Sequence, residues 1–201
     1  DKMFDGIVIK LGKKFGNLSK HSNDMIIAGS SVTDVALSNF AMENSISGLE
    51  FLSCIPGSVG GGIKMNAGCF EREFKDIIIS VQAVDKKGQV ITILKKDINF
   101  EYRNSNLPED LIFLSATFKG NVGNQEKIKK KTLELKEKKE KSQPTRIKTS
   151  GSTFKNPINQ TNKKVWEIIR ESVPLDTNFG DAHISEKHCN FFVNKGNAKY
   201  D

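Results

Sequence analysis

The sequence predicts an α+β fold in which a strand-rich part, a long basic helix and a smaller mixed part follow one another. Two observations lead to this prediction. Short β-branched runs bounded by Gly and polar residues recur up to Phe118, and a long run of strong helix formers follows at residues 125–141. The chain has 201 residues, of which 37% are hydrophobic, and this globular composition allows one large or two small domains.

Five strands and one helix are expected before the basic helix. The Lys-Lys-Gly sequence at residues 86–88 separates two of the strands and is a compact hairpin signal. The helix is expected to run to about Asn44, with Ser31 as its N-cap and Asp34 three residues later. The strands are predicted at residues 6–11, 25–29, 77–85, 89–94 and 111–118.

The net charge of +7 lies in one stretch of the chain. Between Lys119 and Lys148 there are 11 basic and 4 acidic residues, so the rest of the chain is balanced. Ile128, Thr132 and Leu135 fall on one face of the helix expected there, which predicts a mostly solvated helix. The alternative is a site for nucleic acid or another polyanion. Because the stretch has no aromatic residue to stack on a base, we favour the solvated helix and expect no nucleic-acid partner.

Three elements are expected after the basic helix. A segment rich in Gly, Ser and Thr occupies residues 149–153 and is followed by a helical run at residues 162–172. A last strand is predicted at residues 190–193. The mixture of helix and strand on both sides of the basic helix supports the α+β class.

Composition and spacing argue against a membrane, a metal and a disulfide framework. The longest apolar runs, at residues 77–79 and 111–114, are far shorter than the roughly 20 residues that a membrane span needs. No signal-peptide pattern opens the chain, so a cytoplasmic location is expected. Cys54, Cys69 and Cys189 are spaced neither as a disulfide framework nor as a zinc site, and they are expected to be reduced thiols.

The most informative segment is the glycine-rich stretch from Ser53 to Gly68. Five glycines lie between Gly57 and Gly68, together with a hydroxyl at Ser58 and an amide at Asn66. Such a turn allows close approach of the backbone, whose N–H groups bind phosphate. The segment has neither of the common nucleotide-binding signatures. The residues alone therefore leave two interpretations open, a phosphate or cofactor loop and a structural glycine-rich loop.

Four segments in the same order resemble one known family. The sequence Ile-Pro-Gly-Ser-Val-Gly-Gly at residues 55–61, followed by Met-Asn-Ala-Gly at residues 65–68, resembles the flavin-binding segment of the UDP-N-acetylenolpyruvoylglucosamine reductases. Tyr-Arg-Asn-Ser at residues 102–105, Gly-Ser-Thr-Phe-Lys-Asn-Pro at residues 151–157 and the run at residues 184–191 are similar to later segments of that family. The resemblance covers nearly the whole chain.

The resemblance implies a division into three parts. Residues 1–122 are expected to form an FAD-binding lobe of the vanillyl-alcohol-oxidase type, without its N-terminal lobe. Residues 123–148 would be a basic connecting helix. Residues 149–201 are expected to form a smaller α/β substrate-binding domain that lacks its C-terminal part.

The resemblance also implies a reaction. In this family NADPH reduces a noncovalent FAD, and a hydride then passes to the enolpyruvyl group of UDP-N-acetylglucosamine enolpyruvate, which gives UDP-N-acetylmuramate for peptidoglycan precursors. Arg103 would stabilise the enolate-like intermediate and Ser152 would donate the proton. Tyr102 and Asn156 would contact the UDP-sugar. The residues expected to bind FAD are Ser53, Ile55, Pro56, Gly57, Ser58, Gly60, Gly61, Asn66, Ala67 and Gly68.

The sequence departs from the family pattern in several places. Cys54 and Glu71 stand where the family usually has Gly. The family also has a Gly-Ser-Asn phosphate-binding turn before the region that resembles this chain, and a catalytic Glu after it. The alternative interpretation is therefore an inactive fragment of such an enzyme, from a split or decaying gene. A monomer is expected; no heptad pattern or obvious exposed apolar stripe in the sequence marks an interface.

Overall fold

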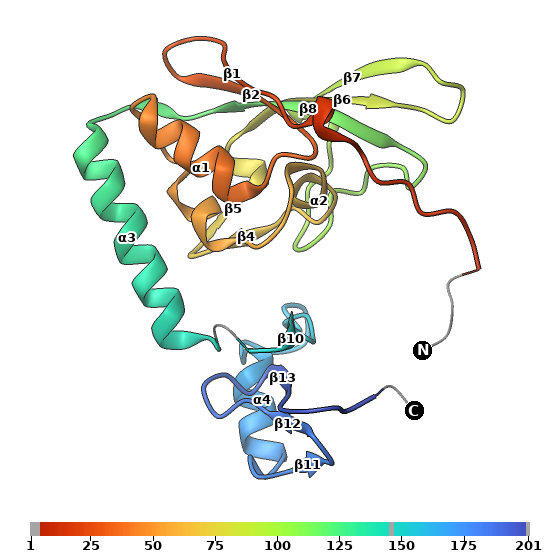
Figure 1. The fold of residues 1–201 in the computed structure, drawn as a ribbon, viewed down its shortest axis with the longest axis vertical. Helices are drawn as coiled ribbons and strands as arrows, with labels where there is room; N and C mark the ends of the chain where they lie inside the picture. Colours follow the sequence, from red (N-terminus) through yellow and green to blue (C-terminus); the bar gives the residue numbers. More distant parts are fainter. Residues whose placement is uncertain (1–4, 145–146, 200–201) are drawn as a thin grey trace. The chain divides into compact units, whose positions relative to one another are not determined.

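The computed structural model describes residues 5–144 and 147–199. The chain divides into two compact units (Figure 1). One comprises Val8–Glu137, and the other comprises Lys138–Asp201 together with the N-terminal residues up to Ile7. Each contains helices and strands, so the predicted α+β class is confirmed.

The first unit is built on a five-stranded antiparallel sheet. Its order is β1-β2-β8-β6-β7. The hairpin between β6 and β7 turns at Gly88, where a φ of 78° favours glycine. The strands predicted near 25–29, 77–85, 89–94 and 111–118 are confirmed to within a residue or so at their ends. The strands are β1 (Leu18–Lys20), β2 (Met25–Gly29), β6 (Ile78–Val84), β7 (Val90–Leu94) and β8 (Ile112–Lys119).

The strand predicted at residues 6–11 is wrong. Ile7, Val8 and Ile9 are largely exposed and pair with no strand among the described residues. A β-rich pattern indicates only that a segment is extended, whereas a strand also needs a neighbour that accepts its hydrogen bonds. A short 3-10 helix, η1 (Lys13–Phe15), then leads into β1.

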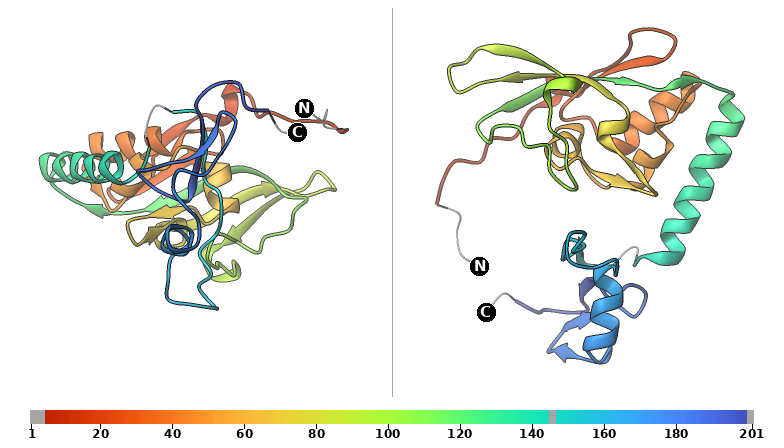
Figure 2. Two further views of the ribbon diagram at one scale, coloured as in Figure 1. Left: turned by 90° about the horizontal axis from the view of Figure 1, so that it is seen from below. Right: turned by 180° about the vertical axis from the view of Figure 1, so that it is seen from behind.

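Helices α1 (Asp34–Glu43) and α2 (Val59–Lys64) lie on the same side of this sheet in the front and rear views (Figures 1 and 2). The predicted cap at Ser31 is wrong, because Thr33 caps α1 by accepting a hydrogen bond from the N–H of Ala36 at 3.1 Å. The backbone next to Ser31 forms hydrogen bonds with other parts of the unit. The carbonyl of Val32 accepts from the N–H of Val59, so this segment is paired with the glycine-rich turn before α1 begins.

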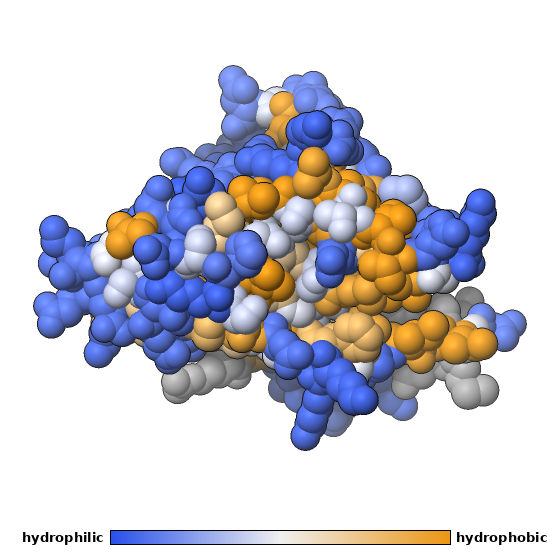
Figure 3. Space-filling model, turned by 90° about the horizontal axis from the view of Figure 1, so that it is seen from above, coloured by the Kyte–Doolittle hydropathy of each residue, from blue (hydrophilic) through white to orange (hydrophobic). Residues whose placement is uncertain are grey.

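The core lies between the sheet and the two helices. The rings of Phe74 and Phe118 meet edge to face, with centroids 5.8 Å apart. Gly62 of α2 packs directly on the Phe74 ring, and a Cβ at this glycine would lie 2.1 Å from the Phe74 Cζ. On the opposite face of the sheet, apolar side chains gather at the surface (Figure 3). The exposed ones include Val90, Leu94 and Ile112.

Shorter elements connect the sheet to the candidate site. Strand β3 (Ile46–Ser47) pairs with β9 (Asn121–Val122), and β4 (Gly68–Cys69) pairs with β5 (Arg72–Glu73). The 3-10 helices are η2 (Glu50–Cys54), η3 (Phe74–Asp76) and η4 (Lys95–Asp97).

The basic helix is confirmed as α3 (Gln125–Ser142). Ile128 and Thr132 are buried and Leu135 is half-buried, while most of its charged side chains are exposed. No helix within residues 5–144 and 147–199 is long and apolar enough to cross a membrane.

The second unit carries a four-stranded antiparallel sheet with one helix. The sheet order is β10-β13-β12-β11. The predicted last strand is confirmed, and the predicted helix begins three residues later than expected. The segment at residues 149–153 forms a strand. These elements are β10 (Thr149–Ser152), α4 (Val165–Ser172), β11 (Asn178–Phe179), β12 (Ala182–Ile184) and β13 (Phe191–Asn194).

Candidate active site

Hydrogen bonds hold one side of the glycine-rich turn to the rest of the protein, and its other side is exposed backbone. Hydrogen bonds from the N–H of Asp34 to the Gly57 carbonyl and from the N–H of Gly60 to the Ser30 carbonyl join it to the start of α1. Ser58 caps α2 by accepting from the N–H of Gly61. A Cβ at Gly61 would meet only the Ser58 Oγ, at 3.7 Å. The outer surface of the turn is therefore exposed backbone.

Two adjacent backbone donors of this turn are available to a ligand. Within the described part of the chain, the N–H groups of Gly57 and Ser58 donate to no protein acceptor. Gly57 is exposed and Ser58 is half-buried. Neighbouring free N–H groups in a glycine turn suit phosphate oxygens. The turn therefore offers two adjacent backbone donors of the kind that suit phosphate oxygens.

The end of the glycine-rich segment lies beside the turn that carries Arg103. The amide of Asn66 donates to the Glu101 carbonyl at 2.9 Å and to Glu73 Oε2 at 3.0 Å, and its Oδ1 accepts from the N–H of Lys75 at 3.0 Å. Asn66 is fully buried. Its side chain thus ties the segment expected to bind FAD to residues 35 positions later in the chain.

Arg103 occupies a turn position that usually favours glycine. Its φ is 58°, and the turn is closed by hydrogen bonds between the backbones of Glu101 and Asn104. The guanidinium donates to the Gly68 carbonyl at 2.9 Å and lies 5.0 Å from the centroid of the Tyr102 ring. Strained backbone of this kind is concentrated at functional sites. The Arg103 guanidinium therefore contacts both the Gly68 carbonyl and the Tyr102 ring.

Asp34 is a buried ionisable group beside the glycine turn. It is fully buried at the first position of α1, and neither carboxyl oxygen has a hydrogen-bond partner among the described residues. A Cβ at Gly57 would lie 3.1 Å from its Oδ2. Burial raises the pKa of Asp34 to about 7, because the charged form loses its hydration. The carboxyl is thus largely protonated in mildly acidic solution.

The remaining expected site residues lie in the second unit. Ser152 ends β10, is exposed and pairs with Phe191 of β13. Gly151 before it has a φ of 87°, which favours glycine. Asn156 accepts the N–H of Val165 at 3.0 Å and so satisfies a donor at the start of α4. The amide of Asn156 therefore has a role in the fold of this unit besides the expected contact with the substrate.

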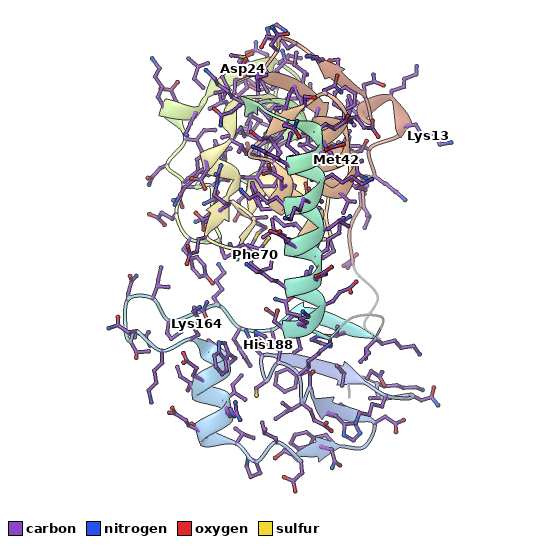
Figure 4. All side chains as sticks on the ribbon, turned by 90° about the vertical axis from the view of Figure 1, so that its left-hand side faces the viewer. Lys13, Asp24, Met42, Phe70, Lys164 and His188 are labelled. Carbon is purple, nitrogen blue, oxygen red and sulfur yellow. The ribbon has the colours of Figure 1, made fainter. Side chains whose placement is uncertain are left out.

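Figure 4 labels His188 in the second unit, where it is one of the residues that line a pocket of about 390 Å³. Its ring lies 4.9 Å from that of Phe191 and 6.4 Å from that of Trp166. His188 is half-buried, and this burial lowers its pKa. The Nδ1 of this ring accepts a hydrogen bond from the N–H of Asn190 at 3.3 Å.

Sequence reasoning missed two residues that organise the site. Glu73 bonds to Asn66 and forms ion pairs with Lys75 and Arg103. Asn190 holds the backbone just after Ser152. Neither residue carries a local signal for its contact with Arg103 or Phe154, because these partners lie 30 and 36 positions away in the sequence.

Two departures from the family pattern are accommodated. Cys54 is buried within η2 and has no positive φ, so this position does not require glycine. Glu71 has a φ of 62° and follows Phe70, whose φ is 50°, so it adopts the backbone conformation that glycine would favour.

Comparisons with known proteins agree with this architecture. Residues 1–94 match a family model described as "FAD binding domain", and residues 143–201 match one described as "UDP-N-acetylenolpyruvoylglucosamine reductase, C-terminal domain". The fold also resembles the crystal structure of UDP-N-acetylenolpyruvylglucosamine reductase from Thermus caldophilus, with a TM-score of 0.79 and 31% identity. That match covers 92% of this chain and 66% of the other.

Sequence relatives carry the same name. The chain is 64% identical to UDP-N-acetylenolpyruvoylglucosamine reductase of Pelagibacter ubique (strain HTCC1062) over 201 residues, which is 100% of this chain and 67% of that protein. It is 44% identical to the Rickettsia typhi protein of that name over 198 residues, which is 98% of this chain and 66% of the relative. The chain thus spans about two thirds of the length of these relatives.

The FAD-binding match and the two-unit α+β fold define a flavin-dependent oxidoreductase. More narrowly, the chain belongs to the UDP-N-acetylenolpyruvoylglucosamine reductase family.

Proposed function

We propose that the protein reduces UDP-N-acetylglucosamine enolpyruvate to UDP-N-acetylmuramate with NADPH, in peptidoglycan precursor synthesis and hence in cell-wall growth and division. The position of Arg103 carries this proposal, since a permanent cation on a strained turn lies beside the last glycine of the segment expected to bind FAD. When bound, FAD would supply the redox chemistry by accepting a hydride from NADPH and delivering one to the enolpyruvyl double bond. One proton completes the reduction of that double bond.

The residues that we propose to hold FAD form the glycine-rich turn and its flanks. The free N–H groups of Gly57 and Ser58 support a role in binding phosphate, and the open backbone at Gly61 supports close approach. The other proposed contacts are Ser53, Ile55, Pro56, Gly60, Asn66, Ala67 and Gly68.

We assign the charge-stabilising role to Arg103. Hydride addition to the enolpyruvyl group moves the electron pair of the double bond towards the carboxylate. A guanidinium offers planar N–H donors that match a carboxylate, and it stays charged at any pH the protein meets. Its partners Gly68 and Glu73 engage two of its nitrogens, so other N–H groups stay available to a ligand. Tyr102 would contact the same ligand.

We assign the proton-donating role to Ser152. A serine hydroxyl is a weak acid, and it protonates carbon only where the acceptor is a strong carbanionic base held nearby. Its exposed position at the end of β10, next to the left-handed Gly151, supports this role. Asn156 would hold the UDP-sugar in the same unit.

The proposed organisation assigns residues 1–122 to FAD binding, residues 123–148 to a connection and residues 149–201 to substrate binding. Because NADPH and nucleotide sugars are cytoplasmic metabolites, we propose that the protein acts in the cytoplasm. The monomeric state stays a prediction.

The function is tested with the complete gene product. We expect the protein purified with FAD to show a flavin spectrum and to turn over NADPH continuously only when the enolpyruvyl substrate is present to reoxidise the flavin, yielding UDP-N-acetylmuramate by mass spectrometry. Arg103→Ala should lower the rate by about 10²-fold or more. A protein that binds no flavin, or that binds flavin without turnover, would contradict the proposal, and the second result would favour an inactive relative.

A further inference from the structure

Three polar side chains converge on the carboxylate of Glu73. Lys75 Nζ lies 2.7 Å from Oε2, the amide of Asn66 donates to the same oxygen at 3.0 Å, and Arg103 Nη1 lies 3.7 Å from Oε1. The Glu73 side chain is 18% exposed. An ion pair so sheltered is screened less than one at an open surface.

Glu73 is itself rigidly held, so it can fix the position of another group. Its backbone lies in β5 opposite Gly68, and the N–H of Phe74 next to it donates to the Ala67 carbonyl. A Cβ at Gly68 would lie 2.7 Å from the Glu73 Cγ, so the two strands touch closely here. The side chain is further fixed by the buried amide of Asn66.

Within the part of the chain that the structure describes, the Arg103 guanidinium has two other contacts. One is the Gly68 carbonyl, which binds Nη2 at 2.9 Å, and the other is the face of the Tyr102 ring. A single hydrogen bond permits rotation of the guanidinium plane, and a ring face attracts a cation without setting its in-plane direction. Glu73 supplies the second anchor on Nη1. The hydrogen bond to Gly68 and the ion pair with Glu73 at 3.7 Å therefore act on two different nitrogens of the guanidinium.

We propose that Glu73 is the positioning residue for Arg103, holding its guanidinium so that the remaining N–H groups are directed to a ligand carboxylate. The inference rests on the proposed function of Arg103. It assigns to Glu73 an effect on ligands that carry a carboxylate, and no effect on ligands that lack one.

The test compares two ligands that differ by the carboxylate. In the complete FAD-bound gene product, calorimetry measures the Kd of UDP-N-acetylmuramate and of UDP-N-acetylglucosamine. Glu73→Gln keeps the shape of the side chain and removes its charge. It should raise the Kd of UDP-N-acetylmuramate by about tenfold and change the Kd of UDP-N-acetylglucosamine by less than about twofold. Equal weakening of both ligands would overturn the proposal, because it would indicate general damage.

A double-mutant cycle tests whether Glu73 acts through Arg103. If it does, Glu73→Gln added to Arg103→Ala should cause no further loss of affinity for UDP-N-acetylmuramate. A full additional loss in the double variant would overturn the proposal. Glu73→Asp retains the charge but moves it back by the length of one methylene group. We expect its affinity for UDP-N-acetylmuramate to fall by an intermediate factor of about three. Unchanged affinity in Glu73→Asp would contradict a positional role.

Two control variants separate this role from local charge. Glu71→Gln removes an exposed carboxylate from the same hairpin, and Lys75→Met removes the other cation bound to Glu73. Both should leave the two Kd values within about twofold. A loss in Lys75→Met as large as that in Glu73→Gln would overturn the proposal. If Arg103→Ala alone leaves the affinity for UDP-N-acetylmuramate unchanged, the proposed function of Arg103 fails, which is distinct from failure at Glu73.

Discussion

Asn190 binds the backbone of Phe154 on both sides. Its Oδ1 accepts from the Phe154 N–H at 3.0 Å and its Nδ2 donates to the Phe154 carbonyl at 2.8 Å. Its own carbonyl accepts from the N–H of Thr153. A buried side chain on the loop before β13 therefore imposes the conformation of the segment that directly follows Ser152.

Asn190→Ala should destabilise the second unit and loosen the backbone after Ser152. It leaves two backbone groups of Phe154 without their partners, which costs roughly 1–3 kcal/mol. Hydrogen exchange of the Phe154 amide should accelerate while amides in β6 of the first unit stay protected. Asn159→Ala, at an exposed position in the same unit, is the control. Unchanged exchange at Phe154 in Asn190→Ala would show that the amide does not hold this segment.

Ser152→Ala should separate the two halves of the reaction. Protonation of carbon follows hydride transfer to the enolpyruvyl group, so the serine has no role in the oxidation of NADPH. Stopped-flow absorbance should show reduction of the flavin by NADPH nearly unchanged and reoxidation by the substrate slowed by about 10²-fold or more. Arg103→Lys should slow the same second half, because a point charge replaces a planar fork. Equal slowing of both halves by Ser152→Ala would withdraw its assignment as the proton donor.

Gly61→Val should weaken FAD binding without a loss of stability. Its Cβ would meet only the Ser58 Oγ at 3.7 Å inside the protein, yet it would cover the open backbone of the turn. We expect the Kd for FAD to rise by about tenfold and the melting temperature of the flavin-free protein to stay within about 2 °C. Gly57→Val should lower flavin occupancy too, and its Cβ also crowds Asp34 Oδ2 at 3.1 Å. Unaltered flavin affinity in both variants would contradict the assignment of this turn.

Asp34 should make the protein less stable as the pH rises. Its pKa is raised to about 7 in the folded protein from 3.8, so the folded state binds more protons than the unfolded state between these values. The contribution of Asp34 to the free energy of unfolding is therefore at its maximum below about pH 4. It falls as the pH rises to 7 and is constant above that pH. Urea unfolding should show a loss of about 3 kcal/mol between pH 5 and pH 8 that Asp34→Asn lacks. An identical loss in both proteins would show that this carboxyl is not buried in its neutral form.

The sequence predicted four of the five strands of the first sheet, β2, β6, β7 and β8, because local residue patterns determine each of them. It did not predict β1 (Leu18–Lys20). The runs at residues 25–29 and 112–119 are bounded by turn residues, and the hairpin turn contains a glycine where a positive φ is needed. The helix at residues 125–142 was predicted for the same reason, since its residues are strong helix formers throughout.

The sequence predictions are wrong or incomplete where contacts between residues far apart in the chain determine the local structure. Ser31 and Thr33 are both good caps, and the pairing of Val32 with Val59 selects Thr33. Residues 7–9 have the composition of a strand, but composition does not supply a partner. Glu73 stands among other charged residues, and its role appears only when Arg103, 30 positions later, folds against it.

The contact between Gly62 and Phe74 has a consequence for how this family can diverge. A Cβ at residue 62 would overlap the ring at residue 74, so the two positions share one fixed volume. Gly62→Ala alone should be strongly destabilising, whereas the same change combined with Phe74→Leu should recover much of the loss. Lineages that exchange the aromatic ring for a smaller side chain are therefore the ones in which alanine can enter the helix, and the two substitutions should be inherited together.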